Sequence, residues 1–202
     1  QKRSLVVAGT HGKTTTSALL AHVFKDGGRS PAYMIGGVFQ GTSDDSYNIG
    51  GQDSKFAIYE GDEYNCAYFD QAPKFLRYNP TSAIITSIEQ DHVDLYPTFP
   101  DYLAAFQFLV EDLPVDGYLI IHESAAALLE LAPVKAHVHV YGSSPQASIQ
   151  YRVEQTDAKG SLFSLTMNGE AITDLRIPLF GAYNVENAVS VSALALLEGI
   201  TP

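Results

Sequence analysis

The 202-residue sequence predicts an α/β domain that has a mostly parallel sheet, helices on both of its faces and a small antiparallel β subsheet. Three observations support this fold class. Short apolar runs alternate with segments of helical periodicity, which is typical of parallel strands joined by helices. A glycine-rich loop joins the first apolar run to the first helical segment. After Pro133, short apolar runs follow one another without intervening helices, which is typical of antiparallel pairing.

Each element is predicted from its own local pattern. The apolar runs expected to form the parallel sheet are 4–8, 33–39, 56–59, 82–88 and 118–122. The segments with helical spacing are 13–24, 99–113, 124–131 and 184–197, and Gly27-Gly28 ends the first. The antiparallel subsheet, at about 136–180, is expected to use runs 138–141, 149–155, 162–167 and 175–178. Asn168-Gly169 lies between two of these runs and is a strong hairpin signal. Residues 41–54 are interpreted as a flexible connection.

The overall composition excludes several classes of protein. Apolar residues make up 46% of the chain and charged residues 17%, which indicates a folded globular domain. The net charge of −11 argues against a nonspecific nucleic-acid surface or an anionic membrane surface as partner. Cys66 is the single cysteine, so no intrachain disulfide can form. No transmembrane run or signal peptide is seen, and we expect a cytoplasmic location.

The loop after the first strand has the features of a phosphate-binding loop. Its sequence is Gly9-Thr10-His11-Gly12-Lys13-Thr14-Thr15, and it opens a helix. The glycines let backbone N–H groups point at phosphate oxygens, and the helix N-terminus adds its positive dipole end. Lys13 is expected to reach the terminal phosphates, and Thr14 offers a hydroxyl to Mg²⁺. The standard motif has a glycine where Val7 stands, so the alternative is a tight turn with a surface lysine. The strand, loop and helix together favour a P-loop sheet.

Carboxylates and a histidine follow two other predicted strands. Glu60 ends the run 56–59, and His92 follows the run 82–88. The carboxyl ends of parallel strands open onto one edge of a sheet, so both side chains are expected beside the phosphate loop. There they can hold metal ions that neutralise charge during phosphoryl transfer. The roles of the neighbouring acidic residues stay open, with loop orientation or pairing with Lys13 as alternatives: Asp62, Glu63, Asp91 and Asp94.

With these motifs in view, the sequence resembles the Mur ligase family. The phosphate loop is similar to the family's ATP loop, and residues 60–63 (Glu-Gly-Asp-Glu) are similar to its magnesium-binding acidic segment. Residues 91–94 (Asp-His-Val-Asp) resemble its Asp-His-X-Asp element, and residues 181–188 resemble its adenine-side segment. Within the family, residues 35–37, 62–65, 69–70 and 74–75 are similar to the murein peptide ligase branch. The four motifs occur in family order and span nearly the whole chain.

The resemblance implies a fold, an activity and a set of site residues. Residues 1–202 would be the central ATP-binding domain, with the N-terminal UDP-binding and C-terminal domains of the same polypeptide lying outside it. The implied reaction joins L-alanyl-γ-D-glutamyl-meso-diaminopimelate to UDP-N-acetylmuramate through an acyl phosphate, in peptidoglycan recycling, and uses ATP and Mg²⁺. We expect little or no ligase activity from this domain alone. Lys13, Glu60 and His92 would be catalytic, and Thr14, Glu60 and His92 would hold metal ions. The ATP would be bound by Gly9, Thr10, His11, Gly12, Lys13, Thr14, Thr15, Asn184 and Asn187.

Two departures from the family pattern and several alternatives accompany this interpretation. Tyr183 stands where the family commonly has a histidine beside the adenine, and residues 102–109 lack the lysine that some branches modify. The UDP-N-acetylmuramate–L-alanine branch shares the ATP loop and the Asp-His-X-Asp element, so it is the close alternative. A folylpolyglutamate-synthase-like ligase, a P-loop kinase and a non-catalytic nucleotide-binding module are the others. The sequence shows no arginine cluster of the kind that a kinase lid would carry.

Overall fold

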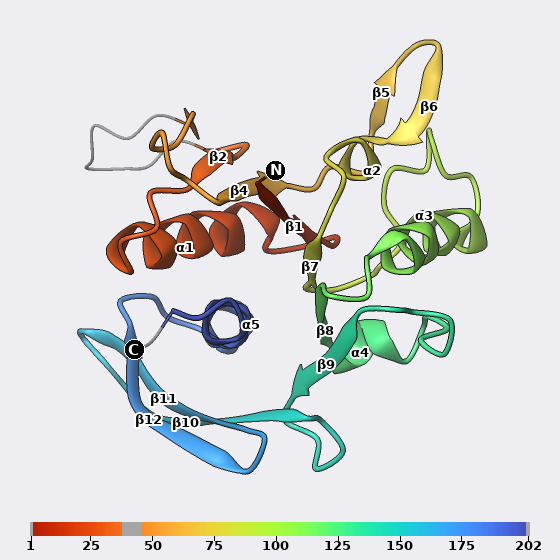
Figure 1. Ribbon diagram of the computed structural model, residues 1–202. Helices are drawn as coiled ribbons and strands as arrows, with labels where there is room; N and C mark the ends of the chain where they lie inside the picture. The colour runs from red at the N-terminus through yellow and green to blue at the C-terminus, as the bar shows by residue number, and fades with distance from the viewer. Residues whose placement is uncertain (1, 38–45, 201–202) are drawn as a thin grey trace.

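The computed structural model describes residues 2–37 and 46–200, in which ten strands form one sheet with helices on both faces (Figure 1). The strand order is β12-β11-β10-β9-β8-β7-β1-β4-β2-β3. The six strands of the parallel part are β1 (Arg3–Ala8), β2 (Ala32–Met34), β4 (Phe56–Glu60), β7 (Ser82–Ile85), β8 (Tyr118–His122) and β9 (His137–Gly142). The short strand β3 (Tyr47–Asn48) pairs antiparallel with β2. The predicted fold class, a mostly parallel sheet flanked by helices, is confirmed.

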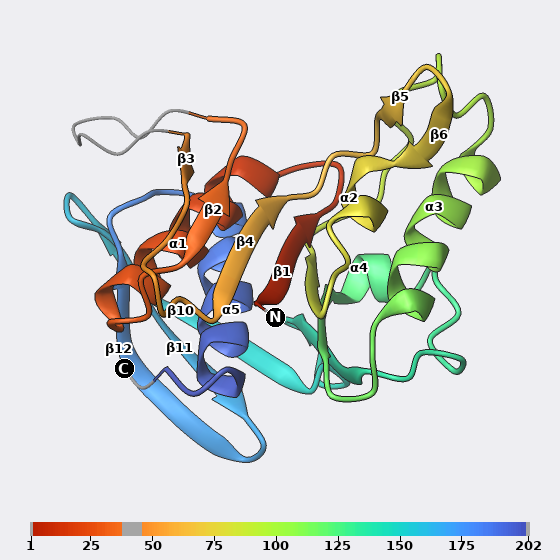
Figure 2. The ribbon, with the colours of Figure 1, turned by 45° about the horizontal axis from the view of Figure 1, so that its top comes forward.

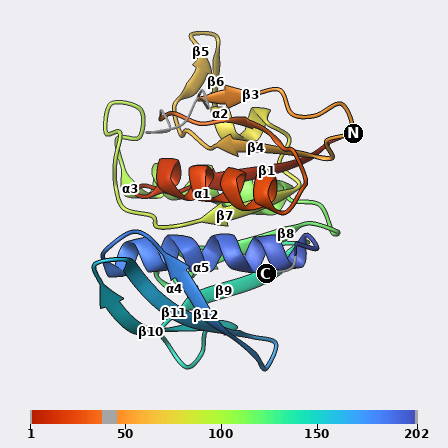
Figure 3. The same cartoon turned by 90° about the vertical axis from the view of Figure 1, so that its left-hand side faces the viewer.

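Alternation along the strands divides the core into two layers. Leu5 and Val7 of β1 face one layer, which is packed against α1 (Lys13–Asp26) and α5 (Ala182–Leu197). Val6 and Ala8 face the other, which is packed against α2 (Lys74–Arg77), α3 (Phe99–Asp112) and α4 (Glu123–Ala126). Helices pack against both faces of the sheet because the strands are apolar on both faces, as parallel strands generally are. Figure 3 shows α1 and α5 running side by side along their face of the sheet.

The antiparallel part of the sheet is formed by β10 (Ile149–Asp157), β11 (Gly160–Met167) and β12 (Glu170–Ile177). These strands curve beneath α5, so that helix is covered on two sides (Figure 1). The predicted hairpin turn lies between β11 and β12, where Asn168 and Gly169 both have positive φ angles, 55° and 81°. Positive φ at both central residues is the conformation that a two-residue hairpin of type I′ requires.

Several boundaries differ from the sequence prediction. The run 138–141 was assigned to the antiparallel subsheet, but β9 pairs parallel with β8, and antiparallel pairing begins only at β10. The strand expected at 82–88 ends at Ile85, because its neighbour β1 ends at Ala8, the partner of Ile85; the Thr86 hydroxyl then donates to the His11 carbonyl of the phosphate loop. The helix expected at 124–131 is a single turn, α4. Parts of the segments 33–39 and 41–54 lie outside the described residues.

A two-stranded hairpin was not predicted. It consists of β5 (Asn65–Ala67) and β6 (Asp70–Pro73) and projects from the carboxyl-end edge of the sheet (Figures 1 and 2). Its turn exposes Tyr68 and Phe69 almost completely. Among the helices in residues 2–37 and 46–200, none has both the length and the apolar character needed to cross a bilayer.

Candidate functional site

The phosphate loop, residues 9–12, connects β1 to α1 at the carboxyl-end edge of the sheet (Figure 2). Two of its glycines are required by geometry. Gly9 has φ 129°, and a Cβ there would collide with the Thr86 side chain. Gly12 has φ 79°, and a Cβ there would lie 2.9 Å from Asn187 Oδ1. The first turn of α1 has no side-chain cap and no acidic residue, so its N–H groups remain available to an anion.

Lys13 is bent back over its own loop. Its ammonium donates hydrogen bonds to the Gly9 carbonyl at 2.7 Å and to Glu63 Oε1 at 3.0 Å. Its side chain is only 17% exposed and that of Glu63 is fully buried. The lysine that was predicted to bind phosphate is therefore held at the loop by a buried carboxylate, for which the sequence left several roles open.

Glu60, at the end of β4, lies beside the start of α1. Thr14 Oγ1 donates to Glu60 Oε1 at 2.7 Å, and the Gly36 N–H donates to Glu60 Oε2 at 2.6 Å. Neighbouring ligands in an octahedron with bonds of about 2.0–2.1 Å lie roughly 2.9 Å apart, so the two paired oxygens fit adjacent positions around one Mg²⁺. The hydroxyl and carboxylate are hard oxygen donors, which that ion prefers. Thr14 and Glu60 therefore fit the metal-binding role predicted for them.

His92 lies in the segment between β7 and α3. It has a positive φ of 52°, which is uncommon for a non-glycine residue and sets the direction of its side chain. Its ring meets the Tyr64 ring edge-on at 4.4 Å between centroids, and its Nε2 lies 3.8 Å from Asp91 Oδ2. Within the described residues, no group of three or more His, Cys, Asp or Glu side chains converges as a metal site. A metal ion near His92 would therefore need oxygen ligands from a substrate or from water.

One cavity of about 530 Å³ brings the three predicted catalytic residues together. Its lining includes Lys13, Glu60 and His92. The size falls within the usual range for small-molecule sites. The sequence predicted that Glu60 and His92 lie beside the phosphate loop at the carboxyl-end edge of the sheet. In the structure they line one cavity together with Lys13.

The other predicted residues of the phosphate loop and of the first turn of α1 do not line this cavity, apart from Lys13. His11 is exposed, with its Nε2 3.5 Å from Glu89 Oε2. Thr10 accepts a hydrogen bond from the Glu89 N–H at 2.9 Å, and Thr15 is half-buried in the first turn of α1.

The two asparagines of α5 occupy different places. Asn187 is buried against Gly12, beneath the phosphate loop. Asn184 is half-buried and donates to the Phe180 carbonyl at 2.7 Å. Neither side chain lines the 530 Å³ cavity, and their contact with an adenine stays a prediction.

Several residues of the site were not singled out from the sequence. Tyr102 of α3 donates to Glu63 Oε1 at 2.9 Å, and Tyr96 donates to the Glu63 carbonyl at 2.7 Å. Burial raises the pKa of Tyr96 to about 12, and it raises the pKa of Tyr102 further, so both hydroxyls stay protonated donors at neutral pH. Lys74 pairs with Asp62 at 2.7 Å on the wall of the cavity. No spacing rule predicts these contacts, since they join separate elements.

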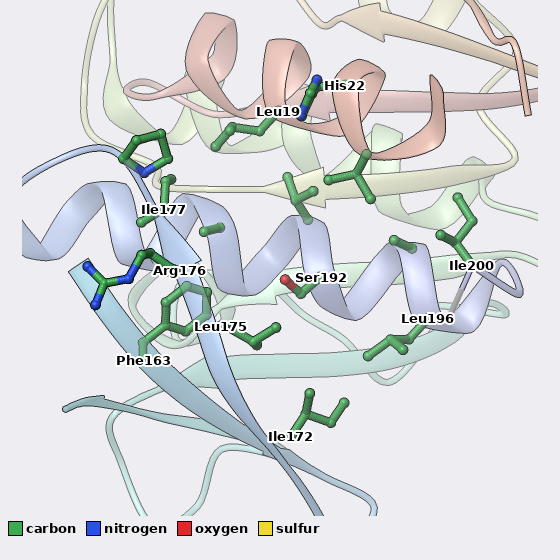
Figure 4. Close-up of a pocket in the computed structure, with 15 residues that line it drawn as sticks. Leu19, His22, Phe163, Ile172, Leu175, Arg176, Ile177, Ser192, Leu196 and Ile200 are labelled. Atoms are coloured by element: carbon green, nitrogen blue, oxygen red, sulfur yellow. The ribbon is translucent and has the colours of Figure 1, made fainter. Parts of the chain in front are cut away.

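A second cavity, of about 330 Å³, lies between α1, α5 and the strands β11 and β12 (Figure 4). Figure 4 shows mainly aliphatic side chains from these elements around the space, such as Leu19, Leu175 and Leu196. None of the predicted site residues lines it. Because carboxylates, a histidine and the loop lysine line the 530 Å³ cavity, that cavity is the candidate functional site.

The fold is a mostly parallel P-loop sheet, and its predicted phosphate loop lies beside a carboxylate suited to Mg²⁺. The family model described as the Mur ligase middle domain matches residues 7–195. The chain belongs to the Mur ligase family.

Curated relatives and solved structures agree with this assignment. The chain is 32% identical over 198 residues to the UDP-N-acetylmuramate–L-alanyl-γ-D-glutamyl-meso-2,6-diaminoheptandioate ligase of Escherichia coli, covering 98% of this chain and 42% of that protein. It is 32% identical over 208 residues to the UDP-N-acetylmuramate–L-alanine ligase of Brucella ovis, covering 99% and 42%. The crystal structure of the UDP-N-acetylmuramate:L-alanyl-γ-D-glutamyl-meso-diaminopimelate ligase from Neisseria meningitidis superposes with a TM-score of 0.84 at 30% identity, covering 98% of this chain and 62% of that one. The chain thus spans about two fifths of the length of these curated relatives.

Proposed function

We propose that this chain is the ATP-binding domain of a ligase that joins the amine of L-alanyl-γ-D-glutamyl-meso-diaminopimelate to the carboxylate of UDP-N-acetylmuramate. The observation that carries the proposal is the convergence of Lys13, Glu60 and His92 on one cavity beside the phosphate loop. A carboxylate does not react with an amine at neutral pH without activation. Phosphorylation of the substrate carboxylate by ATP supplies a better leaving group, and the amine then displaces phosphate.

The residues of this chain would position the reactants and stabilise charge. The loop N–H groups and Lys13 would hold the β- and γ-phosphates. Thr14 and Glu60 would hold Mg²⁺, which neutralises phosphate charge when it is bound. Glu60 and His92 would hold a second Mg²⁺ on the side of the cavity where the acyl phosphate forms. Asn184 and Asn187 would lie toward the adenine, and the exposed Tyr183 ring offers a surface for stacking.

The whole reaction would need the rest of the polypeptide. UDP-N-acetylmuramate and the incoming peptide would be bound mainly by other domains, which agrees with the two-fifths coverage of the relatives. The domain by itself would bind nucleotide and have little or no ligase activity. Its small-molecule partners would thus be ATP, UDP-N-acetylmuramate and a peptide.

The second candidate activity is the addition of L-alanine to UDP-N-acetylmuramate. The Brucella ovis relative with that name is as similar to this chain, at 32% identity, as the Escherichia coli tripeptide ligase. The resemblance of residues 62–65 and 69–70 to the murein peptide ligase branch favours the tripeptide. Both activities would use the same nucleotide site.

The test is to assay the intact protein for phosphate release with ATP, Mg²⁺ and UDP-N-acetylmuramate, and to add either the tripeptide or L-alanine. We expect release with the tripeptide and at least about a tenfold lower kcat/KM with L-alanine, a difference of about 1.4 kcal/mol in transition-state binding. The reverse preference would show the alternative activity. If nucleotide binds but Glu60→Gln and His92→Ala leave the rate of phosphate release at its wild-type value, the chain would instead be a non-catalytic binding module.

A further inference from the structure

Glu63 is a fully buried carboxylate to which the proposed function assigns no role. It belongs to the loop that follows β4, three residues beyond Glu60. Its Oε1 accepts hydrogen bonds from the Lys13 ammonium at 3.0 Å and the Tyr102 hydroxyl at 2.9 Å. Its Oε2 is buried and has no hydrogen-bond partner within the described part of the chain. Burying a charge in this way is costly unless the charge is paired, so the ion pair with Lys13 offsets the cost of burying the Glu63 carboxylate.

The carboxylates nearest to Glu63 in the sequence, Glu60 and Asp62, have other partners. Glu60 accepts from Thr14 and from the Gly36 N–H. Asp62 pairs with Lys74 at 2.7 Å. Lys13 and Glu63 therefore form a separate pair on the wall of the cavity.

Tyr102 extends this pair to the phosphate loop. Its hydroxyl lies 3.1 Å from Thr10 Oγ1 and donates to Glu63 Oε1. The loop is thus held at two points, through the Lys13 ammonium and through Thr10, by residues of two other elements. Tyr102 is itself fully buried and packs edge-on against Phe106, with 5.1 Å between ring centroids, so its hydroxyl has a defined direction.

We propose that Glu63 is a positioning residue, whose buried carboxylate holds the Lys13 ammonium at the phosphate loop before nucleotide binds. This inference rests on the proposed function, because it requires that nucleotide phosphates bind at Lys13. A lysine side chain loses considerable rotamer freedom when its ammonium is fixed. With Glu63 in place, that entropy is lost during folding, so it does not oppose nucleotide binding. One ammonium hydrogen is held only by a long contact, 3.5 Å to the Thr10 carbonyl, and can turn to a phosphate oxygen.

The test is a double-mutant cycle on nucleotide affinity in the intact protein. A nonhydrolysable ATP analogue with Mg²⁺ is titrated by calorimetry into the wild type, Glu63→Gln, Lys13→Met and the double variant. We expect Glu63→Gln to weaken binding about tenfold, the scale of a charge-assisted hydrogen bond, and to have less than about a twofold effect when Lys13 is already Met. A merely structural role would weaken binding equally in both backgrounds.

Glu198 provides the matched control, because it is a second buried glutamate paired with a cation. It accepts from Arg3 at 2.9 Å, and both residues lie at the opposite edge of the sheet. Glu198→Gln is expected to leave analogue affinity unchanged. If Glu63→Gln does not fold, Tyr102→Phe replaces it, since that variant removes the hydroxyl that orients Glu63 but keeps both charges. Tyr102→Phe should weaken binding about threefold, again only when Lys13 is present.

Each outcome separates this inference from the proposed function. If the wild type does not bind the analogue, the proposed function fails and this inference fails with it. If the wild type binds and Glu63→Gln binds equally well or more tightly, only the positioning role is overturned. The same is true if the loss of affinity persists in the Lys13→Met background.

Discussion

Two ion pairs with buried carboxylates lie at opposite ends of the strands of the same sheet, and they differ in whether a carboxylate oxygen is buried without a hydrogen-bond partner. At the amino-end edge, Glu198 Oε1 accepts from Arg3 Nε at 3.1 Å, from Arg3 Nη2 at 2.9 Å and from the Ser82 hydroxyl at 3.1 Å. At the carboxyl-end edge, one oxygen of Glu63 is paired and the other has no partner in residues 2–37 and 46–200. The second pair also borders the 530 Å³ cavity, because Lys13 and Glu63 both line it.

The comparison separates a pair that ties elements together from one placed for binding. Arg3 and Glu198 join the start of β1 to the end of α5, and within the described residues neither oxygen of Glu198 is both buried and without a hydrogen-bond partner. The Lys13–Glu63 pair keeps an ammonium group beside the cavity, and within the described residues Glu63 Oε2 has no hydrogen-bond partner. Incomplete satisfaction of a buried group is costly in folding, so it is expected where a ligand completes the site.

The largest expected effect is on stability, and it comes from Lys13→Met. This change leaves the buried Glu63 carboxylate without a cationic partner, and breaking a buried ion pair in this way typically costs about 3–5 kcal/mol of unfolding free energy. Glu63→Gln in the same chain should restore a large part of that loss, because no uncompensated charge remains. Urea unfolding of the two variants and the wild type measures both values. Equal stability of Lys13→Met and wild type would show that the pair contributes nothing.

A smaller loss is expected for Glu198→Gln. The Arg3 side chain is 28% exposed and can be hydrated after the change, so we expect about 2 kcal/mol rather than the full cost of an isolated buried charge. The same unfolding experiment measures it. A loss of unfolding free energy as large as that of Lys13→Met would show that the two ion pairs do not differ in this way.

Magnesium dependence distinguishes the carboxyl-end edge further. Thr14→Val removes the hydroxyl that lies 2.7 Å from Glu60 and keeps the β-branched shape. We expect the gain in ATP-analogue affinity that Mg²⁺ gives the wild type to fall about tenfold, or about 1.4 kcal/mol. Calorimetric titrations with Mg²⁺ and with a chelator give the ratio. Thr166→Val, at an exposed position in β11, is the matched control and should keep the wild-type ratio.

The smallest expected effect concerns the exposed pair on the cavity wall. Burial acts to raise the pKa of Asp62, but hydrogen bonds from Lys74 and the Tyr64 N–H, with the charges of Lys74 and Lys13, outweigh it and lower the pKa below its ordinary 3.8. The pair therefore stabilises the fold above pH 3.8, and this contribution is lost as pH falls through the lower folded-state pKa. Both side chains are more than a third exposed, so we expect less than about 1 kcal/mol.

Lys74→Met tests this directly. We expect it to raise the Asp62 pKa, as followed by a carboxyl NMR titration. The difference in stability between variant and wild type should shrink when the unfolding experiment is repeated at acid pH. An unchanged Asp62 titration would mean that Lys74 does not hold the carboxylate in solution.

Local patterns predicted most of the elements but not all of their partners. The phosphate loop was predicted because glycines at 9 and 12 with Lys13 have few other uses between a strand and a helix. The hairpin at Asn168-Gly169 was predicted because both residues tolerate positive φ. The parallel pairing of β9 was not, since its sequence resembles the antiparallel strands that follow it, and only the path through α4 brings it back alongside β8. The hairpin of β5 and β6 was missed because its strands are short and only partly buried.

The sequence by itself determined the α/β class, the phosphate loop and the edge of the sheet at which Glu60 and His92 lie. These follow from apolar periodicity and from the rule that parallel strands end at a common edge. Tertiary structure alone decided that Lys13 meets Glu63, 50 residues away, and that Tyr102 joins both to Thr10. Such contacts depend on strand order and on the direction of side chains from three separate elements, and neither is encoded in a local pattern.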